Sequence, residues 1–288
     1  MKAQNNGFAF LSGSSDKTMR KWFVNTRNEN LQGTQVRIGL LCDEFSHFKK
    51  IKPIKEQEDS SNDLGQVRVI CQAKIGNDGL ILWGDSWGYL WIFDAKTLIL
   101  SAILESHQDE IIDISIIKTK NFEDFRNNLI VSCSRDKTVR SFKYQNEELV
   151  EVDDFTSSPL PVIGLDFIHK EGDSIKLVYI DAKSNLCLRE IKQNLTFDSA
   201  VTKNMSPKKF YTLAVRNNRI AIGTDTKIQF GELKSKNYWA LMKSAGGNQS
   251  LMKDFVKLEI DETNTYVFSS CWKSNDVNIW RILEYLWN

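Results

Sequence analysis

The chain has 288 residues, of which 41% are hydrophobic and 11% aromatic, so it can bury a large core. Lys and Arg total 38 against 37 Asp and Glu, and the net charge of +1 excludes long-range attraction of nucleic acid, anionic membranes or acidic partners. Any such contact has to come from a local patch on the surface.

The cysteines and the N-terminus point to a cytoplasmic protein. The N-terminal residues have no apolar signal core, and runs such as Leu98–Leu100 fall far short of the ~18 apolar residues of a spanning helix. Five cysteines are spread widely and lack the close pairs of a zinc site or a redox dithiol. We therefore expect reduced thiols, no cofactor, no metal and no membrane insertion. The cysteines are Cys42, Cys71, Cys133, Cys187 and Cys271.

Short apolar runs rich in Ile, Val, Leu and aromatic residues alternate with turns of Asn, Asp, Gly and Lys along most of the chain. Few segments carry helical periodicity, so the sequence predicts an all-β protein. The expected strands, in chain order, are Phe8–Leu11, Met19–Val24, Val67–Ala73, Leu80–Gly84, Tyr89–Phe93, Leu98–Leu104, Ile111–Ile117, Leu129–Cys133, Val139–Tyr144, Leu149–Val152, Val162–Phe167, Lys176–Ile180, Leu186–Glu190, Leu195–Ala200, Phe210–Val215, Arg219–Gly223, Lys227–Leu233, Tyr238–Met242, Val256–Ile260, Tyr266–Ser270 and Val277–Ile282.

A hairpin signature recurs along the chain. The run from Ser12 to Trp22 (SGSSDKTMRKW) returns from Ser132 to Phe142 (SCSRDKTVRSF), with the same order of small, acidic, hydroxyl and aromatic residues. Two apolar strands joined by such a turn form a hairpin, and its recurrence indicates a repeat architecture. A repeat architecture favours a binding surface over a catalytic pocket.

These motifs, with Trp83–Asp94 and Ser269–Trp280, resemble the WD40 β-propeller family over nearly the whole chain. Grouped in fours, the expected strands form units of roughly 35 to 50 residues, which is the period of such blades. Six units are recognisable, the first and last of them incomplete. We expect one domain over 1–288 with an insertion near 25–65. It forms either a six-bladed ring or part of a seven-bladed one, and it can belong to a larger multi-propeller protein.

The insertion near 25–65 mixes lysines with acidic residues and is longer than one connection needs. We expect a loop, one outer strand near Phe48–Ile54 and an acidic loop. It is either a solvated insertion or a segment that docks a partner.

The WD40 resemblance implies a hydrogen-bonded set of His, Asp, Ser or Thr, and Trp within a blade. In this sequence Ser14, Asp16 and Trp22 match in the first unit. Ser134 and Asp136 match in the third, where Phe142 replaces the Trp, and His107 takes the place of the family histidine. The expected structural hydrogen-bonding residues are therefore Ser14, Asp16, Trp22, His107, Ser134 and Asp136.

Two units depart from this pattern. Trp87 stands at the place of the turn Asp in the second unit, and Lys183 stands there in the fourth. The sequence therefore predicts that these two turns have lost their hydrogen bonds.

A narrower resemblance links the chain to one propeller of the mitogen-activated protein kinase-binding and spindle-pole WD-repeat scaffold proteins. It is carried by Gln66–Val69, Gly84–Leu90, Glu105–Glu110, Ser134–Asp136 and Lys243–Lys253. The resemblance implies a non-enzymatic scaffold in a cytoskeletal assembly (microtubule, centrosome, spindle or cilium) or a kinase-signalling assembly, with other proteins as partners. The alternative is a peptide-recognition propeller subunit of a larger enzyme complex, such as a ubiquitin ligase or phosphatase.

The sequence offers little for catalysis, and we expect no enzyme activity. His47, His107 and His169 form no metal or triad pattern, His169 is expected on the surface, and no Gly-rich phosphate loop is present. Asp153 and Asp154 could form an acid/base pair, but adjacent strand residues face opposite sides, which favours a solvated turn instead.

Four residues are candidates for binding another protein. Turns between the second and third strands of each unit share one face of a WD40 ring, which is where Trp87, Arg135, Trp272 and Lys273 belong. Trp and Arg are frequent binding hot spots because they bury much area and can also form hydrogen bonds. The alternative is that Trp87 or Trp272 folds back over its neighbouring blade.

Overall fold

The computed structural model describes the backbone of residues 7–13, 19–25, 41–45, 67–75, 78–95, 100–117, 129–145, 148–156, 160–169, 175–192, 194–204, 209–216, 219–224, 227–235, 238–246, 255–260, 266–271 and 277–281. Side chains are described for most residues of these segments between 79 and 232. All regular structure in the described residues is β, as the sequence predicts. No helix in these segments is long and apolar enough to cross a membrane.

The strands form six antiparallel sheets in which neighbours in sequence are neighbours in space. The first sheet contains β1 (Gly7–Gly13), β2 (Met19–Asn25) and β3 (Leu41–Phe45). The second contains β4 (Val67–Ile75), β5 (Asp78–Asp85), β6 (Tyr89–Asp94) and β7 (Leu100–Glu105). The third contains β8 (Ile111–Ile116), β9 (Leu129–Ser134), β10 (Thr138–Gln145) and β11 (Glu148–Thr156). The fourth contains β12 (Val162–His169), β13 (Ile175–Asp181), β14 (Asn185–Glu190) and β15 (Val201–Asn204). The fifth contains β16 (Phe210–Arg216), β17 (Arg219–Thr224), β18 (Lys227–Ser235) and β19 (Tyr238–Gly246). The sixth contains β20 (Phe255–Ile260), β21 (Tyr266–Cys271) and β22 (Val277–Arg281).

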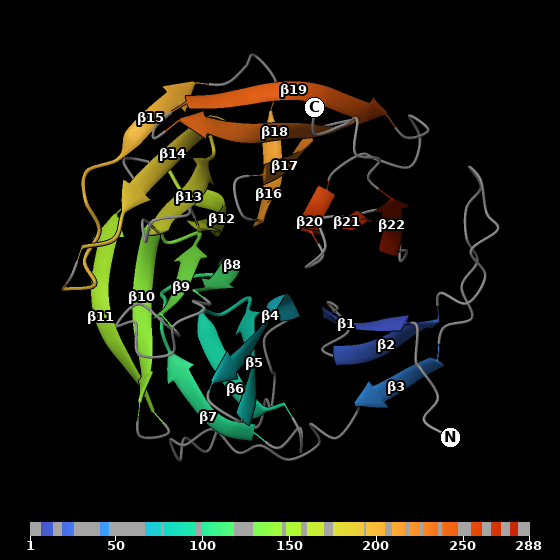
Figure 1. Cartoon of the computed structure of the whole chain (residues 1–288). Helices are drawn as coiled ribbons and strands as arrows, with labels where there is room; N and C mark the ends of the chain where they lie inside the picture. Colours follow the sequence, from blue (N-terminus) through green and yellow to red (C-terminus); the bar gives the residue numbers. More distant parts are fainter. Residues whose placement is uncertain are drawn as a thin grey trace.

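The sheets follow one another around a common centre in chain order (Figure 1). The first strands of the later sheets lie nearest the centre, and β4, β8, β12, β16 and β20 contact one another in series. Among the described strands no comparable contact joins β20 to β1.

The core lies between neighbouring sheets because alternate residues of the second strands face opposite sheets. In β9, Leu129 and Val131 pack toward the fourth sheet, whereas Ile130 packs toward the second. In β13, Leu177 packs toward the third sheet and Val178 toward the fifth. This arrangement explains why β9 and β13 are mostly apolar and are buried on both faces.

Carboxylates tie the inner strands together across the sheet boundaries. Asp113 in β8 accepts a hydrogen bond from the backbone N–H of Leu165 in β12, at 3.1 Å. Asp166 in β12 accepts one from the N–H of Val215 in β16 at 2.7 Å and another from the Ser115 hydroxyl at 2.8 Å. These hydrogen bonds join the first strands at matching levels, the third residue of β8 with the fourth of β12 and the fifth of β12 with the sixth of β16. The third, fourth and fifth sheets therefore present equivalent turns on the same side.

Five first strands share a bulge near their starts. The pairing with the second strand shifts by one residue at each site, whereas β1 pairs with β2 with no shift. The shifts fall between Val67 and Val69, Ile111 and Asp113, Val162 and Gly164, Phe210 and Thr212, and Phe255 and Lys257. The bulge is a recurrent mark of the innermost strand that β1 does not carry.

The strand predicted at Leu195–Ala200 is wrong, because that segment is a turn and the strand is β15, at Val201–Asn204. Leu195 has a left-handed φ of 67°, which interrupts a strand. The Asn194 side chain accepts hydrogen bonds from the backbone N–H and the hydroxyl of Thr196, which stabilises the turn.

Asp153 and Asp154 also differ from expectation, since both lie within β11 and not in a solvated turn. Asp153 is half-buried, and its carboxylate accepts a hydrogen bond from the N–H of Phe197 at 3.1 Å. This hydrogen bond joins β11 to the turn before β15, so Asp153 has a hydrogen-bond partner although it lies within a strand.

The first sheet places a strand inside the predicted insertion. β3 pairs with β2 through Leu41–Phe45, a segment predicted to be loop. Its two central charges, Asp43 and Glu44, hide the strand pattern. The outer strand predicted near Phe48–Ile54 lies outside the described residues.

Candidate functional site

The same five-residue turn joins the second and third strands of three successive sheets. It runs over Asp85–Tyr89, Ser134–Thr138 and Asp181–Asn185. The fourth residue always has a positive φ: 89° at Gly88, 72° at Lys137 and 65° at Ser184. In each turn the N–H of that residue approaches the carbonyl of the first residue, at 3.4, 3.2 and 2.8 Å respectively.

The second and fourth units keep a hydrogen-bonding turn Asp, which corrects the prediction that they had lost it. Asp85 accepts hydrogen bonds from the N–H groups of Trp87 and Tyr89, both at 2.9 Å. Asp181 does the same for Lys183 at 2.9 Å and Asn185 at 3.0 Å. The acid stands at the first turn position and not at the third, and its side chain still reaches the turn amides.

The third turn has the expected Asp at its third position. Asp136 accepts hydrogen bonds from the N–H of Thr138 at 2.8 Å and from its hydroxyl at 2.6 Å. Ser134, at the first position, accepts a hydrogen bond from the N–H of Asp136 at 3.1 Å and donates its own to the carbonyl of Asp109 at 2.9 Å. One carboxylate therefore fastens each turn, at either of two positions.

Asp85 also holds the third strand of its sheet. The indole N–H of Trp91 donates a hydrogen bond to its second carboxylate oxygen, at 2.9 Å. Asp85 is fully buried, and Trp91 packs beside Trp83 on the same sheet face, with ring centroids 6.0 Å apart and the rings tilted by 33°. This Asp–Trp pair has the six-residue spacing of Asp16 and Trp22, but its Asp stands at the first turn position and not at the third.

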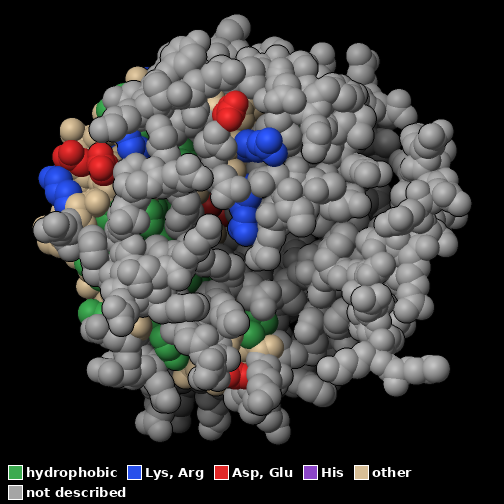
Figure 2. All heavy atoms as spheres, in the orientation of Figure 1, with side chains coloured by type: hydrophobic (Ala, Val, Ile, Leu, Met, Phe, Trp, Pro, Cys, Tyr) green, Lys and Arg blue, Asp and Glu red, His purple; other side chains and the backbone are tan. Residues whose placement is uncertain are grey.

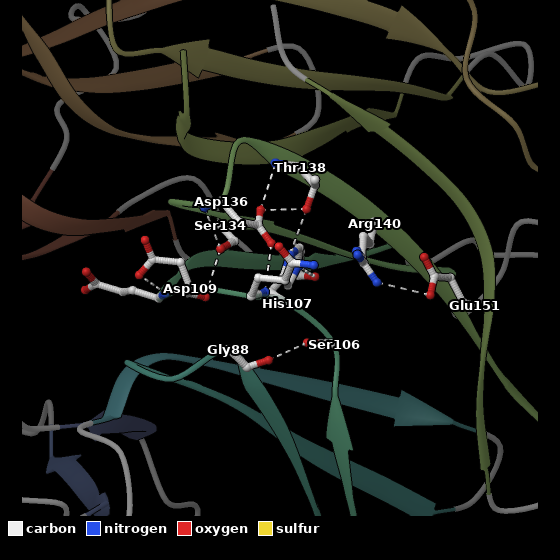
Figure 3. A network of polar contacts seen from close by, with 12 residues as sticks. Gly88, Ser106, His107, Asp109, Ser134, Asp136, Thr138, Arg140 and Glu151 are labelled. Atoms are coloured by element: carbon white, nitrogen blue, oxygen red, sulfur yellow. Dashed lines mark hydrogen bonds and ion pairs between the residues drawn. The ribbon is translucent and has the colours of Figure 1, made fainter. Parts of the chain in front are cut away.

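His107 sits at the centre of a network that joins the β7–β8 connection to the third sheet (Figure 3). Its Nδ1 lies 3.1 Å from a carboxylate oxygen of Asp136 and 2.9 Å from the Thr138 hydroxyl, and its Nε2 lies 2.7 Å from the Ser132 hydroxyl. Because a carboxylate only accepts, Nδ1 carries the proton and Nε2 accepts from Ser132. Of the predicted residues the network unites His107 with Asp136, whereas Ser132 and Thr138 were missed.

Burial keeps the His107 imidazole neutral at neutral pH. Burial lowers the pKa of His107 below its ordinary value, and this effect outweighs the attraction of Asp136. For Asp136, burial raises the pKa, but the hydrogen bonds from Thr138 and Gln108 lower it by more. The pKa of Asp136 is therefore below its ordinary value. The contact between the two side chains is therefore a hydrogen bond to a carboxylate and not an ion pair.

The β7–β8 connection also forms hydrogen bonds with the turn of the second sheet. The N–H groups of Ser106 and His107 donate to the carbonyl of Gly88 at 3.1 and 3.0 Å. A Cβ at Gly88 would stand only 2.3 Å from the His107 carbonyl oxygen, so only glycine fits there. Two turns from neighbouring sheets are thus held to one connecting segment.

Trp87 and Arg135 stand on these two turns and reach the surface. Trp87 is 49% exposed, the largest value among the bulky apolar residues described. The Arg135 side chain is 62% exposed, and its guanidinium pairs with Glu110 at 2.9 Å. The Arg135 N–H also donates to the Glu110 carbonyl at 2.9 Å, so this residue is held at both ends. Figure 2 shows basic and acidic side chains of the described residues together at the left edge and near the upper centre of the visible face.

Several predicted site residues cannot be placed in this arrangement. Ser14, Asp16, Trp272 and Lys273 lie outside the described residues. Trp22 lies in β2, where the structure describes the backbone alone. Within the described segments no cluster of His, Cys, Asp and Glu could hold a metal ion.

The fold and the turns define an all-β protein of repeated antiparallel sheets with fastened turns on one side. A scan against models of known protein families finds no match, and a search of curated proteins finds no similar sequence.

The turn carboxylates are expected to stabilise the fold. Asp136→Ala should lower the free energy of unfolding by about 1 to 3 kcal/mol, because it leaves buried partners unsatisfied. Asp16→Ala should cost a similar amount if the first turn is built in the same way. Chemical denaturation of each variant measures the effect, and no measurable loss in Asp136→Ala would contradict the role of the network.

Proposed function

We propose that the chain is a WD40-like β-propeller that acts as a non-enzymatic scaffold for other proteins. Support for the propeller comes from six antiparallel sheets around a common centre, with inner strands that contact in series. The bulge that recurs in the first strand of five sheets supports equivalent repeated units. β1 lacks this bulge, and its hairpin motif Ser12–Trp22 matches Ser132–Phe142, which joins a second strand to a third, so β1 corresponds to a second strand.

The observation that carries the binding proposal is the exposed indole of Trp87 on a fixed turn. The turn that carries Trp87 is held by hydrogen bonds to the Asp85 carboxylate and by hydrogen bonds from the N–H groups of Ser106 and His107. An aromatic side chain on a rigid support loses little conformational freedom when a partner covers it, which favours binding. Arg135, on the neighbouring turn, adds a charged contact to the same surface. We name the surface of the turns Asp85–Tyr89, Ser134–Thr138 and Asp181–Asn185, with the segments that cover them, the turn face.

The partners we propose are proteins of a cytoskeletal or kinase-signalling assembly. This part rests on the resemblance to the spindle-pole scaffolds. Co-sedimentation with microtubules tests it directly, and a chain that stays in the supernatant at every microtubule concentration would remove the microtubule from this proposal.

Trp87→Ala and Trp272→Ala should abolish capture of a partner from cell extract and leave the thermal transition nearly unchanged. The measurement pairs quantitative mass spectrometry of captured proteins with thermal unfolding of each variant. Val201→Ala offers a control, because Val201 is an exposed apolar residue on the outer strand β15. Equal loss of binding and stability in Trp87→Ala would mark Trp87 as a structural residue instead.

A further inference from the structure

On the turn face, the basic side chains are exposed and most of the acidic side chains are buried or half-buried. Its basic residues Arg135, Lys137, Lys183 and Lys209 are exposed. Lys209 belongs to this face because the next residue, Phe210, donates its N–H to the Ser184 hydroxyl at 2.9 Å. Among the described residues of this face the exposed acids are Asp109 and Glu105, which pairs across strands with Tyr89.

The other acids of the turn face are turned inward. Asp85 and Asp181 are buried, and Asp136 and Glu110 are half-buried. The three aspartates accept hydrogen bonds from turn amides, and Glu110 pairs with Arg135. The carboxylates of these acids interact with groups of the protein itself, whereas the charged ends of the basic side chains reach into solvent. A partner that lies on this surface therefore meets more exposed cations than exposed acids, four against two among the described residues.

Apolar surface accompanies the cations. Trp87 offers the exposed indole on the second sheet, and Tyr211 lies half-buried in β16 with the Lys209 ammonium 5.1 Å from its ring centre. A cation held beside aromatic surface suits a ligand that combines a carboxylate with an apolar side chain.

We propose that the turn face binds an acidic segment of a partner protein, with an apolar side chain against Trp87 and carboxylates against Lys183, Lys209 and Arg135. This rests on the proposed scaffold function and names the chemistry of its ligand. The near-neutral chain as a whole does not attract such a segment from afar, so the recognition comes from this local patch.

An array of synthetic peptides of equal length tests the proposal, with acidic, neutral and basic sets that share the same apolar residues. The purified chain should retain the acidic set preferentially, and retention should fall as salt rises. Lys183→Glu combined with Lys209→Glu should weaken the acidic peptides by about tenfold or more and turn the preference toward the basic set. Trp87→Ala should weaken retention of every peptide that carries an apolar residue.

Lys192→Glu is the matched control, because Lys192 is an exposed lysine beyond the far end of β14, paired with Asp198 at 3.3 Å. It should leave the preference unchanged. Retention of the neutral or basic set as strong as that of the acidic set, and still dependent on Trp87, would overturn the acidic ligand and leave the scaffold proposal standing. Retention that no turn-face variant alters would count against both. Equal competition by a single-stranded oligonucleotide, unaffected by Trp87→Ala, would overturn the protein ligand in favour of a nucleic acid.

Discussion

Replacement of Asp85 by alanine is expected to lower the free energy of unfolding by about 3 kcal/mol, the largest stability change that we predict for a single turn residue. The variant leaves the buried indole N–H of Trp91 and the turn amides of Trp87 and Tyr89 without their acceptor. Each unsatisfied buried donor costs about 1 to 3 kcal/mol, and water reaching the amides returns part of that.

Urea denaturation of Asp85→Ala measures this loss, with Asp109→Ala as the matched control. Asp109 is an exposed Asp whose side chain accepts a hydrogen bond from the N–H of Glu110. The control should lose less than about 1 kcal/mol, the scale of a solvated local hydrogen bond. Equal losses in the two variants would show that burial of the Asp85 carboxylate does not matter.

His107→Phe is expected to lower the free energy of unfolding by about 2 to 3 kcal/mol at neutral pH, because Phe keeps the ring but leaves Ser132 and Asp136 short of a partner. The difference from wild type should shrink as the pH falls. The folded-state pKa of His107 lies below the ordinary value of 6.5, so the unfolded chain takes up the proton first.

The sign of that pH dependence follows from the direction of the shift. The contribution of His107 is complete above pH 6.5 and is lost as the pH falls toward the folded-state pKa, by at most about 1.4 kcal/mol per pH unit. Asp136 adds a further loss below its ordinary pKa of 3.8, because its folded-state pKa is lowered. Urea denaturation of both proteins at pH 7.5 and 5.5, roughly one unit on either side of the His value, tests this. A gap that widens at pH 5.5 would contradict a neutral, buried His107.

The fold could be predicted from the sequence wherever strands bury alternate residues against two sheets. β9 and β13 are examples, since every residue from Leu129 to Cys133 is apolar or small. β15 was misplaced because Leu195 and Phe197 read as an apolar strand, although the backbone of Leu195 is left-handed. The pattern of apolar residues alone does not reveal a turn that is stabilised by hydrogen bonds to one Asn side chain.

The candidate site was predicted less well than the sheets. Sequence reasoning fixed the turn Asp to one position, so Asp85 and Asp181 were overlooked. The physical requirement is a carboxylate within reach of the turn amides, and both the first and the third position meet it. An Asp six residues before a strand Trp, as in Asp85 and Trp91, was the available signal. Ser132 was missed because the nearby Ser134 matches the family motif and was therefore taken as the serine of the hydrogen-bonded set.

Within single turns of the turn face, some residues hold the backbone and others project into solvent. Asp85 points inward and fastens the backbone, and Trp87, two residues later, points into solvent. In the next sheet Ser134 is inside and the following residue, Arg135, is outside. Rigid support and exposed contact therefore come from residues one or two positions apart in the same turn.

The most direct test of the account compares Trp87→Ala with Asp85→Ala in one experiment, measuring the thermal midpoint and the amount of partner captured from cell extract. We predict that Trp87→Ala keeps the wild-type midpoint and loses the partner, whereas Asp85→Ala lowers the midpoint. A Trp87→Ala variant that retains its partner, or whose midpoint falls as far as that of Asp85→Ala, would contradict the assignment of the turn face as a protein-docking surface.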